Sequence, residues 1–295
     1  MSVKVLSDFD GVWTDQTFEA ENVKLFLVAE AARLAGIGAD ETRAHFARFE
    51  RIVKAAPSRF GWAPDGRITA YVDEDPFCDA NSLTMYLESA RDDADAALYA
   101  AAILDNGFEN LTQFADHCFM TATNTFRMQH PPALVPHAKA MFHALVDAGA
   151  EVVVVSNSSS DKIVGWFRQI GVDAGVEHGV GLRVRGSAAK FVIGPSDRSI
   201  EVGGRRIYVD RPRYEAVIRE EQPALVIGDV FSLDLALPHV MRSAKTPGAP
   251  SELVLRRHPH TPRWVLDTKA DGAIDRVVEH VGELVESIHR HAKVS

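Results

Sequence analysis

Four consecutive valines, Val152 to Val155, form the strongest structural signal in the chain. A run of β-branched residues without polar alternation is typical of a strand that is buried on both faces of a parallel sheet. Shorter apolar runs at Val3–Ser7, Leu225–Ile227 and Leu253–Leu255 repeat this pattern. The sequence therefore predicts a buried parallel sheet, with one of its strands at Glu151–Ser156.

Segments with helical periodicity lie between these runs. Pro136–Ala148 and Lys162–Ile170 carry apolar residues at helical spacing, and a glycine follows each of them. The clearest periodic segment runs from Ile274 to Ile288 and predicts a single C-terminal helix. Because strands alternate with helices, we expect an α/β fold with a doubly wound parallel sheet.

A long stretch, residues 16–130, interrupts the alternation and is mostly helical in pattern. The expected helices are Asn22–Ala35, Glu41–Ala55, Ala94–Leu104 and Leu111–Phe126. We therefore expect a catalytic core of residues 1–15 and 131–295, with an inserted helical cap of residues 16–130. A second irregular stretch, Gly175–Asp210, has Gly203-Gly204 between β-like runs and predicts a hairpin.

Composition narrows the classes of protein. A chain of 295 residues, 46% of them hydrophobic, can bury a large core. The formal net charge of -9 argues against a nucleic-acid partner, which requires clustered Lys and Arg. Cys78 and Cys118 are not in a CxxC, which favours a reducing compartment. No apolar run approaches the ~20 residues that span a bilayer. We expect a cytoplasmic protein with no membrane partner.

Polar residues follow three of the predicted strands. Asp8 and Asp10 stand at the end of the first strand, Ser156 and Asn157 at the end of the valine strand, and Gly228-Asp229 at the end of a later one. Ligands of open α/β sheets bind beyond the carboxyl ends of the strands. Each group alone also fits a solvated turn or a helix N-cap, whereas three together at one sheet edge predict a phosphate and metal site.

The three groups, in this order, resemble the motifs of the haloacid dehalogenase superfamily. Asp8–Thr14 is similar to its first motif, DxDGxxT, and the strand that ends in Ser156 is similar to its second. Gly228–Asp234 is similar to its fourth motif, GDxxxxD. The resemblance covers residues 1–14 and about 133–295. The helical insertion lies where that superfamily places its C1-type cap, but the cap sequence itself resembles nothing that we recognise.

This resemblance implies a Mg²⁺-dependent phosphatase that acts on a small phosphorylated metabolite. In such an enzyme Asp8 would be the nucleophile that forms an aspartyl-phosphate, and Asp10 the general acid and base. Ser156 and Asn157 would hold the transferred phosphoryl group. The metal-site residues that the resemblance implies are Asp8, Asp10, Asp229 and Asp234.

The third motif of the superfamily is a basic residue, and two residues fit it. Arg211-Pro212 resembles the usual Lys-Pro step before the fourth motif and is the preferred candidate, with Lys190 as the alternative. The same acids would also serve a phosphomutase or other phosphotransferase, or a non-catalytic protein that binds a phosphate ligand. A dehalogenase would not need an acid at Asp10. The sequence specifies neither the substrate nor the oligomeric state.

Two pairs of histidines and two aromatic residues lie outside these motifs. The pairs His258/His260 and His289/His291 are interpreted as surface residues, because a proline separates one pair and the other lies at the end of the sequence. Trp62 and Phe77, in the loop region of the expected cap, are the aromatic residues that we expect to contact the substrate.

Overall fold

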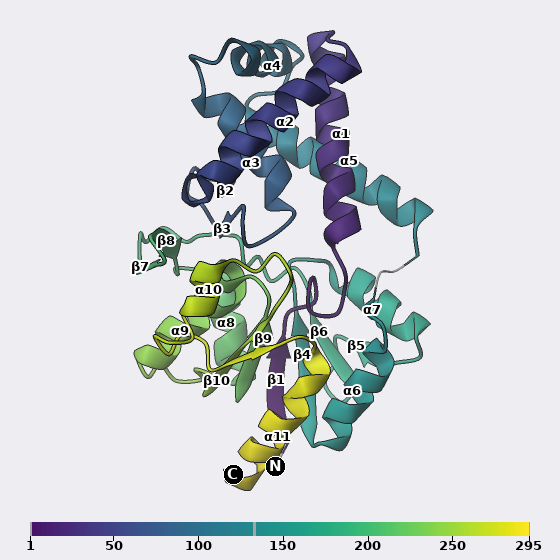
Figure 1. Cartoon of the computed structure of the whole chain (residues 1–295). Helices are drawn as coiled ribbons and strands as arrows, with labels where there is room; N and C mark the ends of the chain where they lie inside the picture. The colour runs from purple at the N-terminus through teal and green to yellow at the C-terminus, as the bar shows by residue number, and fades with distance from the viewer. Residues whose placement is uncertain (1, 132–133, 295) are drawn as a thin grey trace. The chain divides into compact units, whose positions relative to one another are not determined.

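The computed structural model of the chain describes residues 2–131 and 134–294. The chain divides into two compact units (Figure 1). The first, which we call the core unit, consists of Met1–Asp15 and Ala133–Ser295, and the second, the helical unit, consists of Gln16–Pro132.

A seven-stranded sheet forms the centre of the core unit, in the order β11-β10-β9-β1-β4-β6-β5. Every neighbouring pair is parallel. The register pairs Val3 with Ala150 and Ser7 with Val154. The strands are β1 (Val3–Ser7), β4 (Ala150–Val155), β5 (Ala174–Gly175), β6 (Leu182–Arg185), β9 (Leu225–Gly228), β10 (Glu252–Arg256) and β11 (Arg276–Val278).

Helices bury both faces of this sheet, which confirms the predicted doubly wound α/β fold. Val5, Val152 and Ile227 pack on one face with residues of α6, α7 and α11. The alternate residues Leu6 and Val153 point to the opposite face and are equally buried. The core helices are α6 (Ala138–Asp147), α7 (Ser160–Gln169), α8 (Pro212–Glu221), α9 (Ala236–Ser243), α10 (Arg263–Asp267) and α11 (Val285–Val294).

The strands that carry the polar groups are neighbours in this order. β1 lies between β9 and β4, so the ends of all three meet at one edge of the sheet. Asp8, Ser156 and Asp229 follow these three strands directly. The topology therefore gathers residues that are more than 200 positions apart in sequence.

Two parts of the core unit differ from the sequence prediction. Ile274–Ile288 is not one helix, because Val277 and Val278 pair with Leu255 and Arg256 as strand β11. Consecutive β-branched residues favour a strand over a helix. A 3₁₀ turn (Val281–Leu284) then precedes α11.

The stretch Gly175–Asp210 contains the predicted hairpin, formed by β7 (Ser199–Val202) and β8 (Arg205–Tyr208). It also supplies β6, which pairs with β4 in the large sheet. The sequence analysis did not predict this strand, because Arg183 and Arg185 interrupt the apolar run that would indicate it.

The helical unit is held by an aromatic cluster. Phe46 and Phe49 of α2 pack against Tyr99 of α4 and Tyr86 of α3, with the Phe46 and Tyr99 ring centroids 5.1 Å apart. The helices are α1 (Thr17–Ala35), α2 (Ala39–Ala55), α3 (Cys78–Ser89), α4 (Ala94–Asp105) and α5 (Leu111–Gln129), with a short 3₁₀ turn (Pro57–Arg59) and a two-stranded ribbon of β2 (Gly61–Trp62) and β3 (Ala70–Tyr71).

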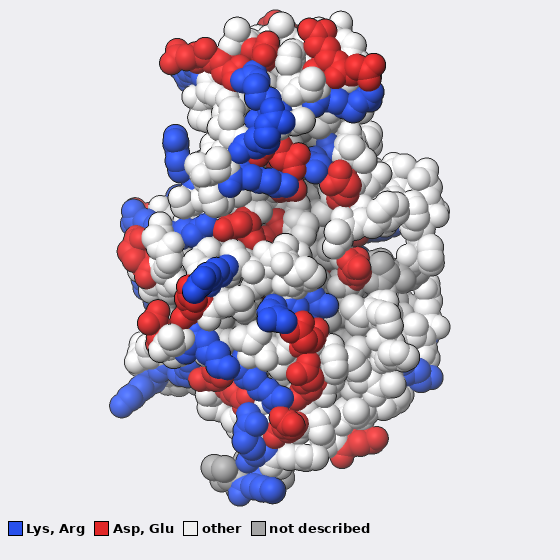
Figure 2. Space-filling model, in the orientation of Figure 1, with Lys and Arg blue, Asp and Glu red and all other residues white. Residues whose placement is uncertain are grey.

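Charged side chains of both signs are interspersed on the face of the molecule that Figure 2 shows. Ion pairs among the described residues include that of Arg185 with Glu220 at 2.7 Å. In the described part of the chain, no helix combines the length and the apolar character needed to cross a membrane.

A substitution at Gly228 tests how tightly the turn after β9 is packed. A Cβ at Gly228 would lie 2.2 Å from Cβ of Asp234, whereas a Cβ at Gly165, inside α7, would have no atom within 4 Å. We expect Gly228→Ala to lower the free energy of unfolding by about 1–3 kcal/mol through overpacking. The control Gly165→Ala should raise it by about 0.5–1 kcal/mol through helix propensity. Urea denaturation measures both; equal effects would contradict the packing described.

Candidate active site

Three carboxylates meet beyond the ends of β1 and β9. Asp8 follows β1, Asp229 follows β9, and Asp234 lies on the π-helical turn Phe231–Leu235. One oxygen from each lies within 4.8 Å of the others, and all three residues are buried. π-Helical turns are rare and frequent at functional sites. Buried acids this close repel one another unless cations accompany them.

Two glycines make this close approach possible. Gly11 has a φ of +80°, and a Cβ there would lie 2.0 Å from Oδ2 of Asp229. Gly228 leaves the space that Asp234 occupies. The glycines of the two sequence motifs are therefore required by the contact between the loops that carry the acids.

Lys190 is the cation that the described residues place among these acids. Its Nζ lies 2.5 Å from Oδ1 of Asp8 and 2.6 Å from Oδ1 of Asp234. Burial opposes the charge of the ammonium, but the carboxylates of Asp234 and Asp8 outweigh it and raise the pKa of Lys190 above its ordinary value. Lys190 is therefore a permanent positive charge beside Asp8.

Hydrogen bonds hold the backbone of Lys190 at its N–H and at its carbonyl. Ala189, the residue before it, has a φ of 48°, a left-handed conformation that is costly for a residue other than glycine. Oδ1 of Asn157 accepts a hydrogen bond from the Lys190 N–H at 2.7 Å, and Nη1 of Arg211 donates to the Lys190 carbonyl. These bonds hold the strained loop in place and direct the Lys190 side chain towards Asp8.

The preference for Arg211 as the third-motif cation therefore does not agree with the geometry. Arg211 is fully buried and binds the backbone of Lys190, while the Lys190 ammonium contacts Asp8 itself. The Arg-Pro step misled the sequence analysis because Pro212 simply occupies the first position of α8, where proline is favoured. Lys190, the alternative in the sequence analysis, is the better candidate.

The electrostatics of the remaining acids follow from burial. Burial, reinforced by Asp234, raises the pKa of Asp8 well above its ordinary value, and the Lys190 ammonium acts in the opposite direction. Burial and Asp234 likewise raise the pKa of Asp229, against the effect of Lys190. The Lys190 ammonium, and the Arg256 guanidinium that also acts on Asp229, thus do not offset the burial of these acids and their mutual repulsion.

A hard divalent cation would offset this repulsion and stabilise the ionised acids. Oδ1 of Asp229 is buried and has no hydrogen-bond partner among the described residues. Both oxygens of Asp234, in contrast, accept hydrogen bonds, from Lys190 and from the N–H of Val230 at 3.1 Å. Carboxylate oxygens are the ligands that Mg²⁺ prefers. Asp8 and Asp229 are therefore the side chains best suited to bind it, with Asp234 orienting the site through Lys190.

Asp10 lies in a second polar group, beyond the ends of β1 and β4. Its Oδ2 accepts hydrogen bonds from Ser156 Oγ at 3.0 Å and from Ser158 Oγ at 2.9 Å. Nζ of Lys162 lies 3.3 Å from Oδ1. The carboxylate of Asp10 is thus oriented by three donors and is separate from the buried group of three acids.

The sequence analysis missed Lys162. Its Nζ also contacts Ser158 Oγ at 3.0 Å and lies over the ring of Trp166, 4.9 Å from the centroid. The residue stands in the first turn of α7, whose N-cap is Ser159. A lysine six positions after Ser156 at a helix start was the available signal, because the first turn of that helix borders the site.

The interpretation of His258 as a surface residue is wrong. Its side chain is 13% exposed, and Nε2 lies 3.1 Å from Oδ2 of Asp229. Burial and the nearby Arg256 guanidinium lower the pKa of His258 to about 4. In the other pair, His291 binds Glu252 at 2.9 Å, away from the acids.

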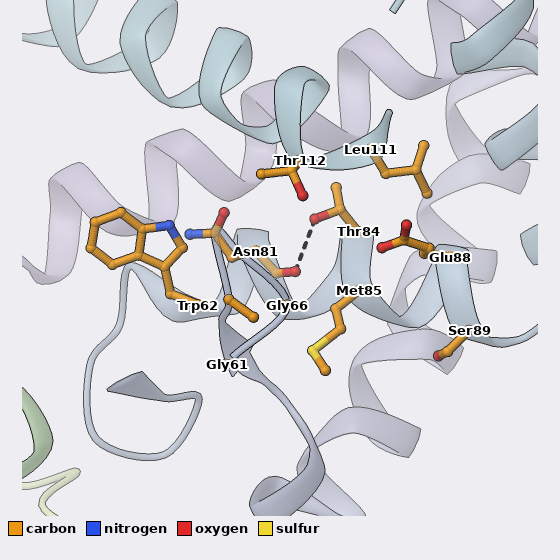
Figure 3. A pocket seen from close by; sticks show the side chains of 11 residues that line it. Gly61, Trp62, Gly66, Asn81, Thr84, Met85, Glu88, Ser89, Leu111 and Thr112 are labelled. Atoms are coloured by element: carbon orange, nitrogen blue, oxygen red, sulfur yellow. Dashed lines mark hydrogen bonds between the residues drawn. The ribbon is translucent and has the colours of Figure 1, made fainter. Parts of the chain in front are cut away.

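A cavity of about 300 Å³ lies within the helical unit (Figure 3). Trp62 lines one end of it and Glu88 the other, and Asn81 lies between them. Trp62, one of the two aromatic residues expected to contact substrate, therefore borders a space that could hold a small molecule. Phe77 does not line this cavity, and its ring packs on Phe119 at 5.5 Å.

No family model and no curated protein matches the chain. Solved structures do, and among them are a HAD phosphatase from Thermococcus onnurineus (14% identity, 97% of both chains covered, TM-score 0.47) and CbbY from Rhodobacter sphaeroides in complex with phosphate (12% identity, 96% of both, TM-score 0.44). A 2-haloacid dehalogenase from Pseudomonas syringae also matches (15% identity, 99% of this chain and 100% of that one, TM-score 0.45). At such identities the similarity assigns neither substrate nor reaction.

Proposed function

We propose that this chain is a phosphatase of the haloacid dehalogenase superfamily that hydrolyses a small phosphorylated metabolite through an aspartyl-phosphate on Asp8. The observation that carries the proposal is the contact of Lys190 with Asp8 and Asp234, beside a bare carboxylate oxygen of Asp229. This arrangement joins a nucleophile, a fixed cation and candidate metal ligands within one buried group.

The charges explain why these residues occur together. A phosphate monoester carries about two negative charges near neutral pH, and Asp8 alone would repel it. Lys190 offsets part of this repulsion. A bound Mg²⁺, held by Asp8 and Asp229 with the backbone of Asp10, would supply the remaining positive charge.

In the first step, a carboxylate oxygen of Asp8 forms a bond to phosphorus as the bond from phosphorus to the ester oxygen breaks. Asp10 donates a proton to that leaving oxygen. The hydroxyl of Ser156 and the N–H of Asn157 hold the transferred phosphoryl group. The product alcohol leaves, and Asp8 remains as the aspartyl-phosphate.

In the second step, Asp10 takes a proton from water, and the water oxygen attacks phosphorus. The bond from phosphorus to Asp8 breaks, which releases inorganic phosphate and restores the carboxylate. The hydrogen bonds from Ser156, Ser158 and Lys162 favour this role, because they fix the direction of the Asp10 carboxylate.

A phosphotransferase would use the same first step and differ only in the acceptor. We propose water as the acceptor, and phosphate release without a phosphosugar acceptor would distinguish the two reactions. In a dehalogenase, by contrast, Asp10 and its three hydrogen-bond donors would have no role in the reaction. We therefore assign hydrolysis of a phosphate ester.

Trapping the covalent intermediate tests the assignment of Asp8 and Asp10. We expect Asp10→Asn to accumulate a phosphorylated protein with an activated aryl phosphate and Mg²⁺, because loss of the base slows the second step by ~10²–10⁴-fold. Asp8→Asn lacks the attacking carboxylate and should show no adduct. Intact-protein mass after rapid quench measures both. An adduct on Asp8→Asn would place the nucleophile elsewhere, and an unmodified Asp10→Asn with wild-type turnover would remove Asp10 from the reaction.

The role of the basic residues gives a second prediction. Lys190→Ala removes the ammonium beside Asp8, and we expect phosphate release to fall by roughly 10²-fold or more. Arg211→Ala removes a bond to the Lys190 backbone but leaves the Lys190 ammonium beside Asp8, so it should cost less activity per folded molecule and mainly lower the thermal midpoint. Circular dichroism establishes the folded fraction. A folded, inactive Arg211→Ala beside an active Lys190→Ala would restore Arg211 as the third-motif cation.

A further inference from the structure

His258 is held in a defined orientation directly after β10. Its ring stacks on His260, with centroids 4.8 Å apart and an interplanar angle of 15°. Its backbone N–H donates to Oγ1 of Thr261 at 2.8 Å. The ring is therefore fixed from its face and from its backbone, and Nε2 points at Oδ2 of Asp229 at 3.1 Å.

The neighbours of His258 determine which ring nitrogen carries the proton. Nη1 of Arg256 lies against both ring nitrogens, in contact with Nδ1 and 2.6 Å from Nε2, and the backbone of Gly11 also hydrogen-bonds the imidazole. An ionised carboxylate can only accept, so the contact with Asp229 places the proton on Nε2. Nδ1 is then free of a proton and can accept from Arg256, which is compatible with this tautomer.

The two oxygens of Asp229 are thus in different situations. Oδ2 is bound by His258 and packs closely against Gly11, whose added Cβ would lie 2.0 Å away. Oδ1 is buried without a hydrogen-bond partner among the described residues. A carboxylate with one oxygen fixed and the other bare is oriented for a ligand on the bare side.

We propose that His258 is a positioning residue that binds Oδ2 of Asp229 so that Oδ1 is directed at a divalent cation, with Arg256 packed against the imidazole. This inference rests on the proposed function, because it concerns the metal site of that reaction. It adds a histidine, and an arginine behind it, to a site that the sequence motifs describe by acids alone.

The direct consequence is a change in metal affinity. Without the imidazole, the Asp229 carboxylate can rotate, and orienting it again on binding costs free energy. Loss of such partners of metal-ligating side chains commonly weakens metal binding by 10–100-fold. Glutamine at position 258 retains an N–H donor of similar reach and should restore part of the affinity.

Isothermal titration of the full chain with Mg²⁺ tests the proposal without any substrate. The variants are His258→Ala, His258→Gln and the control His260→Ala, which removes the stacked ring but leaves the donor to Asp229. Asp229→Asn marks the loss of the site. Thermal unfolding in chelator confirms that each variant is folded.

We expect His258→Ala to bind Mg²⁺ 10–100-fold more weakly than wild type, His258→Gln to lie between the two, and His260→Ala to stay within about threefold. Wild-type affinity in His258→Ala would overturn the inference and leave the proposed function intact. An equal loss in His258→Ala and His260→Ala would also overturn it, since packing rather than the hydrogen bond would then be responsible. A wild-type chain that binds no Mg²⁺ would overturn the metal site itself.

Discussion

The ammonium of Lys190 is the charge on which the active-site edge of the sheet depends. Its Nζ lies within 2.6 Å of Asp8 and Asp234, and all three side chains are less than 10% exposed. Two like charges 4 Å apart repel each other with a free energy of about 4 kcal/mol at the effective dielectric constant typical near a protein surface. Without Lys190, the acids at the ends of β1 and β9 could not all be ionised together. A divalent cation would offset the repulsion among these acids that the Lys190 charge leaves.

The rest of the core unit supports this interaction. The parallel order β9-β1-β4 brings the motif-bearing strand ends side by side. Gly11 and Gly228 remove the Cβ atoms that would keep the acids apart. Arg211 and Asn157 hold the backbone of Lys190 against the strain at the residue before it. Polar groups that look like independent turns in the sequence therefore form one connected structure.

The sequence predicted the parts of this site that depend on local pattern. The strands β1, β4 and β9 were recognisable because a buried parallel strand reads as an apolar run, and their last residues identified Asp8, Ser156 and Asp229. Ile274–Ile288 was misjudged because valines that suit a strand also matched helical spacing. Pairing with β10 favours the strand over the helix, and this tertiary contact cannot be read from a single sequence.

Lys190 was the alternative rather than the preferred cation in the sequence analysis, and Lys162 and His258 were missed, for a different reason. Each lies in a loop or at a helix start whose path is set by contacts with distant residues. Lys190 reaches Asp8, 182 positions away, only through a loop with left-handed residues that no sequence pattern marks. His258 was taken for a surface residue because nothing in the order His-Pro-His reveals that Asp229 lies beside it.

The most direct measurement of the central claim is anomalous X-ray scattering from a crystal of the full chain soaked in Mn²⁺, a substitute for Mg²⁺ with the same preference for oxygen ligands. The electrostatic account predicts one strong anomalous peak within bonding distance of Asp8 and of Oδ1 of Asp229, with Lys190 still bound to Asp8. Saturating Mn²⁺ with no peak at these carboxylates would contradict the account.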